Sequence, residues 1–161
     1  MKPSAILLIA AGLASTAIAT SALRAQDSAA QPLPLTELMG HVMQRNAYQL
    51  WAWTALESDE AGNHSGEPTS EEDWENAESD ALTLRQLAVV LRGAPYRQED
   101  SRWDKLATEL EAAATASAQA AERKDLAGLI SAGEAINARC VACHWAFAPA
   151  LEEAPPPVPV S

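Results

Sequence analysis

The stretch Cys140-Val141-Ala142-Cys143-His144 lies near the C-terminal end of this 161-residue chain and contains its only two cysteines. Two cysteines three residues apart, with a histidine directly after the second, form the attachment signal for a covalently bound haem. On one turn of helix the two thiols can each form a thioether with a haem vinyl group, and the adjacent imidazole can bind the iron. The motif therefore predicts one haem c, attached through Cys140 and Cys143, with His144 as the proximal iron ligand.

Apolar residues at spacings of three and four indicate amphipathic helices over residues 35–58, 71–92, 100–122 and 126–149, with a polar loop over 58–68. Ser70 with Asp73 forms a capping box, and Asp125 can cap the fourth helix. The second helix would bury Trp74, Ala77, Ala81, Leu84, Leu87, Ala88, Val90 and Leu91. The fourth would carry the haem motif on an inner face with Leu126, Leu129, Ile130, Gly133, Ile136, Asn137 and Phe147. This pattern predicts an all-α fold, an antiparallel up-down four-helix bundle.

Both ends of the chain differ in composition from the helical part. Residues 1–25 have the features of a secretory signal peptide: Lys2, an apolar run and small residues that allow cleavage after Ala22 or Ala25. An uncleaved membrane anchor is the alternative, but the strongly apolar core is short for a span. We expect a flexible linker over 26–34, the bundle domain over 35–149 and a proline-rich disordered tail over 150–161. Export predicts a periplasmic protein without a stable membrane span after processing.

The charge balance is strongly acidic, with 11 basic and 22 acidic residues and a net charge of −11. Removal of the signal peptide would leave nine basic residues against the same 22, a net charge of −13. Such a balance argues against nucleic acid or an anionic membrane as partner and allows a redox partner with a basic docking surface. Ten acidic side chains and no basic ones occur between Glu57 and Asp80. They form either a solvated surface or a docking patch for such a partner.

The position of the motif restricts the source of a sixth iron ligand. Only 17 residues follow His144, and none is methionine, histidine or lysine. Upstream, Met39 and Met43 lie on the inner face of the first predicted helix, where they could also simply fill the core. His41 lies off that face and His64 lies in the acidic loop, so both are expected to be exposed.

The chain resembles the class II cytochromes c, which comprise cytochrome c prime and its low-spin four-helix relatives. The resemblance covers residues 36–149 and rests on the haem motif with helical markers at Leu38-Met39, Ala47, Trp51, Trp74, Ala81 and Trp103. It implies a distal residue from the first helix, with Met39 the first choice and Met43 the close alternative. Two features depart from the family: Arg45 stands where relatives often have proline, and Trp145-Ala146 stand where basic residues are common. The first departure can alter the geometry at the start of the first helix. The second removes positive charge beside the haem, so a partner surface cannot simply be taken over from the relatives.

Three functions follow from this pattern. Periplasmic electron transfer requires both axial positions to be closed by histidine and methionine. If Met39 and Met43 only pack, a five-coordinate iron would instead bind nitric oxide or carbon monoxide. A thiol oxidoreductase would need a thiol with a lowered pKa at a helix N-terminus, which the late position of the cysteines disfavours. We expect a non-enzymatic electron carrier, and a homodimer through the exposed sides of the first two helices is compatible with the sequence.

Overall fold

The structure, a computed structural model, describes residues 31–59 and 62–149. The chain divides into two compact units, Met1–Leu33 and Pro34–Ser161, and every helix and strand described here belongs to the second. The predicted signal peptide over 1–25 and the tail over 150–161 lie outside the described residues. Of the predicted linker over 26–34, only residues 31–34 are described, and they form no helix or strand.

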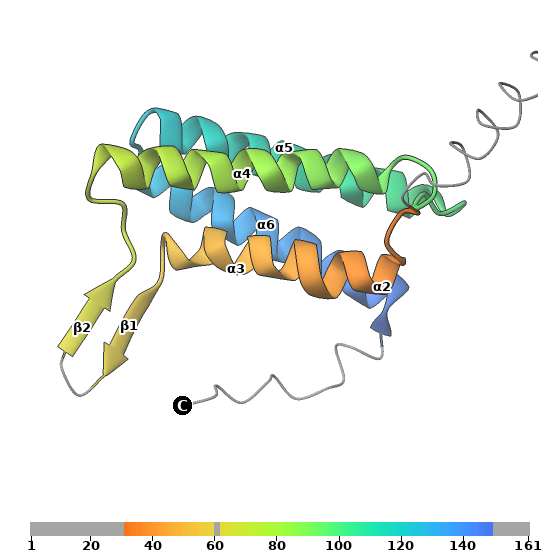
Figure 1. Cartoon of the computed structure of the whole chain (residues 1–161), viewed down its shortest axis with the longest axis horizontal. Helices are drawn as coiled ribbons and strands as arrows, with labels where there is room; N and C mark the ends of the chain where they lie inside the picture. The colour runs from red at the N-terminus through yellow and green to blue at the C-terminus, as the bar shows by residue number, and fades with distance from the viewer. Residues whose placement is uncertain (1–30, 60–61, 150–161) are drawn as a thin grey trace, which may run out of the picture. The chain divides into compact units, whose positions relative to one another are not determined.

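The second unit is a helical bundle, which confirms the predicted helical fold (Figure 1). Its first helix has three parts, and three longer helices and one hairpin follow. The elements are α2 (Leu35–Glu37), η1 (Leu38–Met43), α3 (Gln44–Ala52), β1 (Leu56–Asp59), β2 (Gly62–Ser65), α4 (Glu71–Leu91), α5 (Ser101–Glu122) and α6 (Leu126–Phe147).

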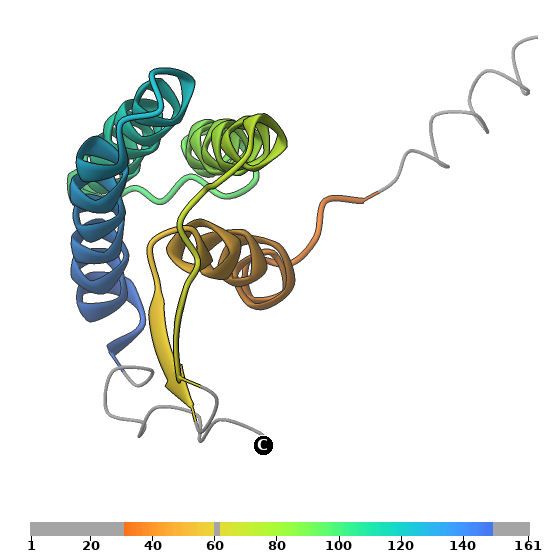
Figure 2. The same ribbon diagram turned by 90° about the vertical axis from the view of Figure 1, so that its left-hand side faces the viewer.

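The four helices lie at the corners of a bundle when viewed along their axes (Figure 2). Consecutive helices run in opposite directions, as the colours show in Figure 1. α4 packs along α5, α5 along α6, and α3 along α4. Among the described elements, the backbone of α6 does not approach α2, η1 or α3 as closely as these neighbouring helices approach one another. The bundle is therefore closed on three sides, and the side between the first helix and α6, which we call the seam, is held less tightly.

The core consists of leucine, isoleucine and many alanines, whose small side chains allow α4, α5 and α6 to approach closely. Leu84, Leu129 and Ile136 are the largest side chains that are fully buried. The predicted inner faces are right for most positions and wrong for three. Val90, Ile130 and Asn137 are exposed, because the buried stripe on each helix is narrower than the apolar pattern suggests.

The first helix ends at Ala52 rather than near residue 58, so the predicted helical end is wrong. The Thr54 N–H donates to the Trp51 carbonyl, which tightens the last turn and leads the chain out of the helix. The expected polar loop is instead an antiparallel hairpin in which β1 pairs with β2. The Gly66 N–H donates to the Ala55 carbonyl and closes the hairpin. A Cβ atom at Gly66 would lie 1.8 Å from the Ala52 carbonyl oxygen, so only glycine fits there.

The first helix is also not regular near its start. Residues Leu38–Met43 form a π-helical turn, in which the Gln44 N–H donates to the carbonyl of Met39, five residues earlier. Leu38 and Met43, five residues apart, are the two buried residues of this turn. The π-helical turn ends two residues before Arg45, where the family that the sequence resembles often has a proline. π-turns of this kind occur frequently at functional sites.

A pair of leucines on α4 tests the assignment of its buried face. Leu84 is 1% exposed and Leu82 is 40% exposed. We expect Leu84→Ala to lower the free energy of unfolding by about 2–5 kcal/mol, because it removes core contacts and leaves a cavity. Leu82→Ala should change it by no more than ~0.5 kcal/mol. Urea unfolding followed by circular dichroism measures both, and equal losses would contradict the assigned face.

The predicted capping box at the start of α4 is confirmed. The Asp73 N–H donates to Ser70 Oγ at 3.1 Å, and the Asp73 carboxylate accepts the Ser70 N–H at 2.9 Å and the Thr69 N–H at 3.0 Å. These hydrogen bonds, led by the one from the Thr69 backbone, lower the pKa of Asp73 from 3.8 to about 2. The charged carboxylate is therefore the form that the folded helix start favours.

This cap gives the stability a defined dependence on pH. Because the pKa of Asp73 is lower in the folded than in the unfolded chain, its contribution is complete above pH 4 and disappears as the pH falls towards 2. We expect the urea midpoint of the unmodified chain to fall more steeply over this range than that of Asp73→Asn. Glu75→Gln, which removes an exposed carboxylate two residues later, should retain the steep fall. Parallel pH profiles for the unmodified chain and Asp73→Asn would contradict the cap's role.

Candidate functional site

The residues of the haem motif occupy the last two turns of α6. Cys140, Cys143 and His144 are all half-buried, and both cysteines are free thiols. Both thiols pack against the core cluster that includes Ile136, one turn earlier on the same helix. One helical turn therefore presents two unpaired thiols and an adjacent imidazole at the border between the core and the surface.

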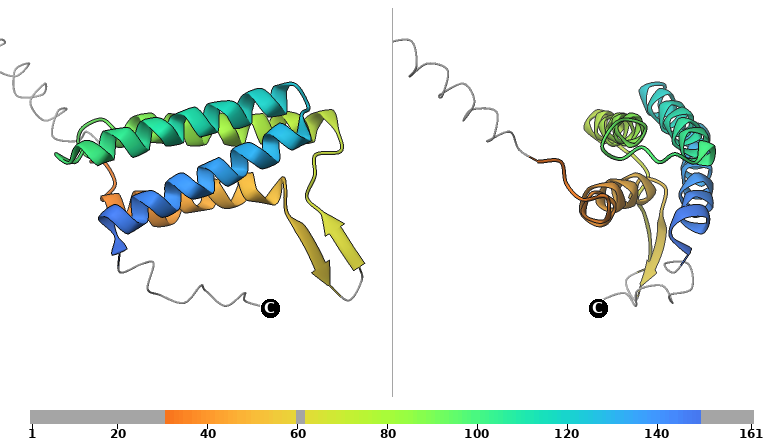
Figure 3. Two further views of the ribbon diagram at one scale, coloured as in Figure 1. Left: turned by 180° about the vertical axis from the view of Figure 1, so that it is seen from behind. Right: turned by 90° about the vertical axis from the view of Figure 1, so that its right-hand side faces the viewer.

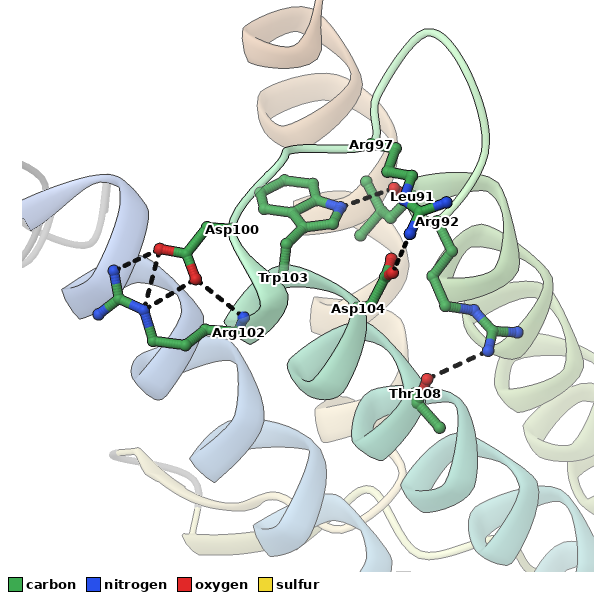
Figure 4. A network of polar contacts seen from close by, with 8 residues as sticks. All are labelled: Leu91, Arg92, Arg97, Asp100, Arg102, Trp103, Asp104 and Thr108. Atoms are coloured by element: carbon green, nitrogen blue, oxygen red, sulfur yellow. Dashed lines mark hydrogen bonds and ion pairs between the residues drawn. The ribbon is translucent and has the colours of Figure 1, made fainter.

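The end of α6 is fixed by contacts with the start of α5. The Phe147 ring meets the Trp103 ring edge-on with 5.1 Å between centroids, and the Arg102 guanidinium lies 5.6 Å from the Phe147 centroid. Figure 4 shows that Trp103 Nε1 donates to the Leu91 carbonyl at 2.7 Å and that Arg102 is held by Asp100. These contacts tie α4, α5 and the last turn of α6 together, so the motif stands on a supported end of its helix.

The π-helical turn faces this end of α6 across the seam. Thr54 lies against Gly133, where a Cβ atom would be 3.9 Å from Thr54 Oγ1. The first helix and α6 run in opposite directions (Figure 3), so equal counts along the two helices from this contact reach Met43 and His144 together. Met43 is buried in the core cluster, and the half-buried Met39 packs against it together with both cysteines. The structure thus brings the two candidate methionines and the motif to one end of the bundle.

The seam leaves apolar side chains of α6 without full cover. Only Leu129, Ala132 and Ile136 are buried among the 22 residues of α6, and none of them follows Ile136. Among the described residues, α6 is the one helix long and apolar enough to cross a membrane, yet only 17% of its most apolar window is buried. The C-terminal half of α6 therefore carries apolar side chains that the other described helices do not fully cover.

An unpaired polar atom lies near the seam on the first helix. The indole Nε1 of Trp51 is buried and has no hydrogen-bond partner among the described residues. Trp51 lies in the last turn of α3, its carbonyl accepts the N–H of Thr54 in the turn that follows, and Thr54 lies against Gly133 of α6. A buried N–H without an acceptor fits a site whose occupant brings its own acceptor, as a haem does with its propionates.

The two thiols are poor nucleophiles in this setting. Burial, with a smaller effect of the neighbouring Cys143, raises the pKa of Cys140 to about 11. Burial also raises the pKa of Cys143 above its usual value. Both groups are consequently thiols at neutral pH, and a dithiol oxidoreductase requires a thiolate.

The remaining predicted residues lie away from this arrangement. His41 is exposed on η1 and lies 3.3 Å from Glu37, as expected for a surface histidine. His64 belongs to β2, and its side chain is outside the described part. No group of three or more histidine, cysteine or acidic side chains that could hold a metal ion occurs in the described part of the chain. Two polar surface hollows, of about 480 and 490 Å³, share Arg97 and Asp104 at the α4–α5 connection and do not include the motif.

No family model, no curated protein and no solved structure matches this chain.

Sequence reasoning did not find three features of this site. The π-turn has no signature in the residues of 38–43, which fit a regular helix equally well. The unpaired Trp51 N–H depends on what surrounds the ring, which the sequence does not show. The contact of Arg102 with Phe147 joins residues 45 positions apart, and only the packing of α5 against α6 brings them together.

Proposed function

We propose that this chain is a periplasmic monohaem cytochrome c of the class II kind and that it transfers electrons. The observation that carries the proposal is the placement of Cys140, Cys143 and His144 on a half-buried face of α6, opposite the methionine-bearing η1 and beside an incompletely covered seam. The half-exposed thiols are accessible for attachment, and the apolar face beside them would cover a macrocycle. The unpaired Trp51 N–H supports the same occupant.

Different residues of the chain would attach the haem, bind its iron and shield it from water. Cys140 and Cys143 would attach it, His144 would bind the iron from one side, and Met39 would bind from the other, with Met43 as the alternative. Phe147 and Trp103 would exclude water from that end of the seam. A bound haem supplies a one-electron iron couple whose potential depends on its axial ligands and on its burial.

Gas binding is the second candidate, and one observation favours it. Met43 lies in the core cluster and Met39 packs against it, so both side chains already have packing partners without an iron. If neither moves to the iron, the distal position stays open in an apolar environment, where nitric oxide or carbon monoxide could bind. The spin state of the iron separates the two functions.

The decisive experiment is expression of the full chain in a bacterial host that has the proteins for cytochrome c maturation. We expect a periplasmic protein that keeps its haem on a denaturing gel, with a low-spin spectrum and a methionine–iron charge-transfer band when oxidised. A high-spin spectrum with rapid carbon monoxide binding would favour gas binding instead. A colourless, folded protein would refute both functions.

A further inference from the structure

The fold separates the charges of the chain along the bundle. We call the half that contains residues 35–45, 84–111 and 139–149 the motif end, because it includes the haem motif. We call the half that contains residues 46–59, 62–83 and 112–138 the hairpin end. By the sequence, the motif end has seven basic and six acidic residues, a net charge of +1. The hairpin end has two basic and twelve acidic residues, a net charge of −10.

A partner at one end of the bundle is influenced mainly by the charges of that end. α4 has 21 residues and is therefore ~30 Å long. Salt screens charges on exposed surfaces over about 8 Å at physiological ionic strength. A molecule that approaches the motif end consequently meets the local charges of that end, and the large negative charge of the hairpin end is screened.

The cations of the motif end extend further into solvent than the carboxylates that they pair with. Arg97 pairs with Asp104, Arg102 with Asp100, and both Lys105 and Arg139 with Glu109. In every pair the basic side chain is the more exposed one; the largest difference is that between Lys105, 73% exposed, and Glu109, 34%. Figure 4 shows Arg102 at the start of α5, beside the last turns of α6, and Arg97 on the α4–α5 connection, on the other side of Trp103. In these four pairs the cationic groups therefore reach further into solvent than their counterions, although Glu37 and Glu99 at the same end are exposed as well.

Two apolar side chains are exposed at the same end. Trp145, which directly follows His144, is 58% exposed, and Val141, one turn earlier on α6, is 38% exposed. Large exposed aromatic rings are enriched at the centres of protein interfaces. The motif end thus has an apolar centre on α6 and a cationic border on α5.

We propose that the motif end is the docking surface for a redox partner with an acidic surface. The proposal rests on the function proposed above, since it requires an iron next to His144. A basic partner, which the overall charge of the chain would suggest, would instead be attracted to the hairpin end, the opposite half of the bundle.

Electron transfer with small charged reagents tests this proposal on the haem-loaded full chain. The reduced protein is mixed with ferricyanide, an anion, or with the cation tris(phenanthroline)cobalt(III), over a range of ionic strengths. We expect the ferricyanide rate to fall as the ionic strength rises, despite the net charge of −13 after removal of the signal peptide (9 basic and 22 acidic residues), because the exposed cations attract the anion. Arg97→Gln combined with Lys105→Gln should lower that rate severalfold at low salt.

A matched pair of substitutions at the hairpin end serves as the control. Glu72→Gln combined with Glu75→Gln also changes the net charge by two, at exposed positions of α4. It should leave the ferricyanide rate unchanged if local charge governs docking. A ferricyanide rate that rises with salt would overturn the proposal, and so would effects of similar size and opposite sign from the two pairs, which change the net charge by −2 and +2; a normal haem spectrum in these variants leaves the proposed function intact. A chain without a haem spectrum would refute the proposed function, and this docking surface with it.

Discussion

Replacing both Cys140 and Cys143 by serine is expected to abolish covalent attachment of haem completely. Haem bound without thioethers is extracted by acid acetone, whereas haem bound through them remains with the protein. The measurement is the haem that stays with the chain after extraction, and the double variant should retain none. Haem that resists extraction from the double variant would refute the attachment site.

The single variants give the same test in two steps. Cys140→Ser and Cys143→Ser should each keep one thioether, and the pyridine haemochrome band should shift to longer wavelength with each thioether lost. Both side chains are half-buried, so a serine hydroxyl can reach solvent, and the circular dichroism of the helices should be unchanged. Val141→Ser is the matched control, because it places a serine on the exposed face of the same motif and leaves both thiols intact.

The helices could be predicted because local signals coincide with the tertiary pattern. α4 begins after the Ser70 cap, α5 after the Asp100 cap and α6 after the Asp125 cap, and in each the side chain accepts a backbone N–H of the first turn. Apolar spacing and capping are both short-range properties, and both are present in the sequence. The predicted bounds of these three helices consequently agree with the structure to within a few residues.

The errors occur where local pattern does not determine the outcome. The polar stretch after the first helix fits a loop, and its hairpin depends on Gly66, which approaches the Ala52 carbonyl of the preceding turn. Ile130 and Asn137 were expected inside because α6 is apolar on several faces, so its sequence does not define a single buried stripe. Competing faces on one helix can be distinguished only by the helices that pack against it.

The candidate site combines what the sequence contains with what only the fold adds. The cysteines, the histidine and the two methionines are identifiable from residue type and spacing alone. Their meeting at one end of the bundle depends on the antiparallel course of the first helix and α6, which Figure 1 shows. The acidic run between Glu57 and Asp80 is equally visible in the sequence. Its separation from the haem motif by the length of a helix is a property of the fold.

Replacing Met39 by leucine is expected to convert the oxidised iron from low-spin to high-spin. Leucine has a similar volume and no sulfur, so the substitution removes the ligand and keeps the packing, at a cost below ~1.5 kcal/mol. The expected changes are loss of the methionine–iron charge-transfer band and a large gain in the rate of carbon monoxide binding. Because His144–methionine ligation raises the reduction potential, the potential should also fall.

Met43→Leu is the matched variant and separates ligation from packing. Met43 is buried in the core cluster, whereas Met39 is half-buried beside it, so Met39 has more freedom to turn towards the seam. We therefore expect Met43→Leu to leave the spectrum low-spin and to change mainly the stability. A high-spin spectrum from Met43→Leu alone would assign the ligand to Met43, one helical turn away. Low-spin spectra from both single variants and from the double variant would exclude methionine ligation. A high-spin spectrum of the unmodified chain would instead establish the open distal position that gas binding requires.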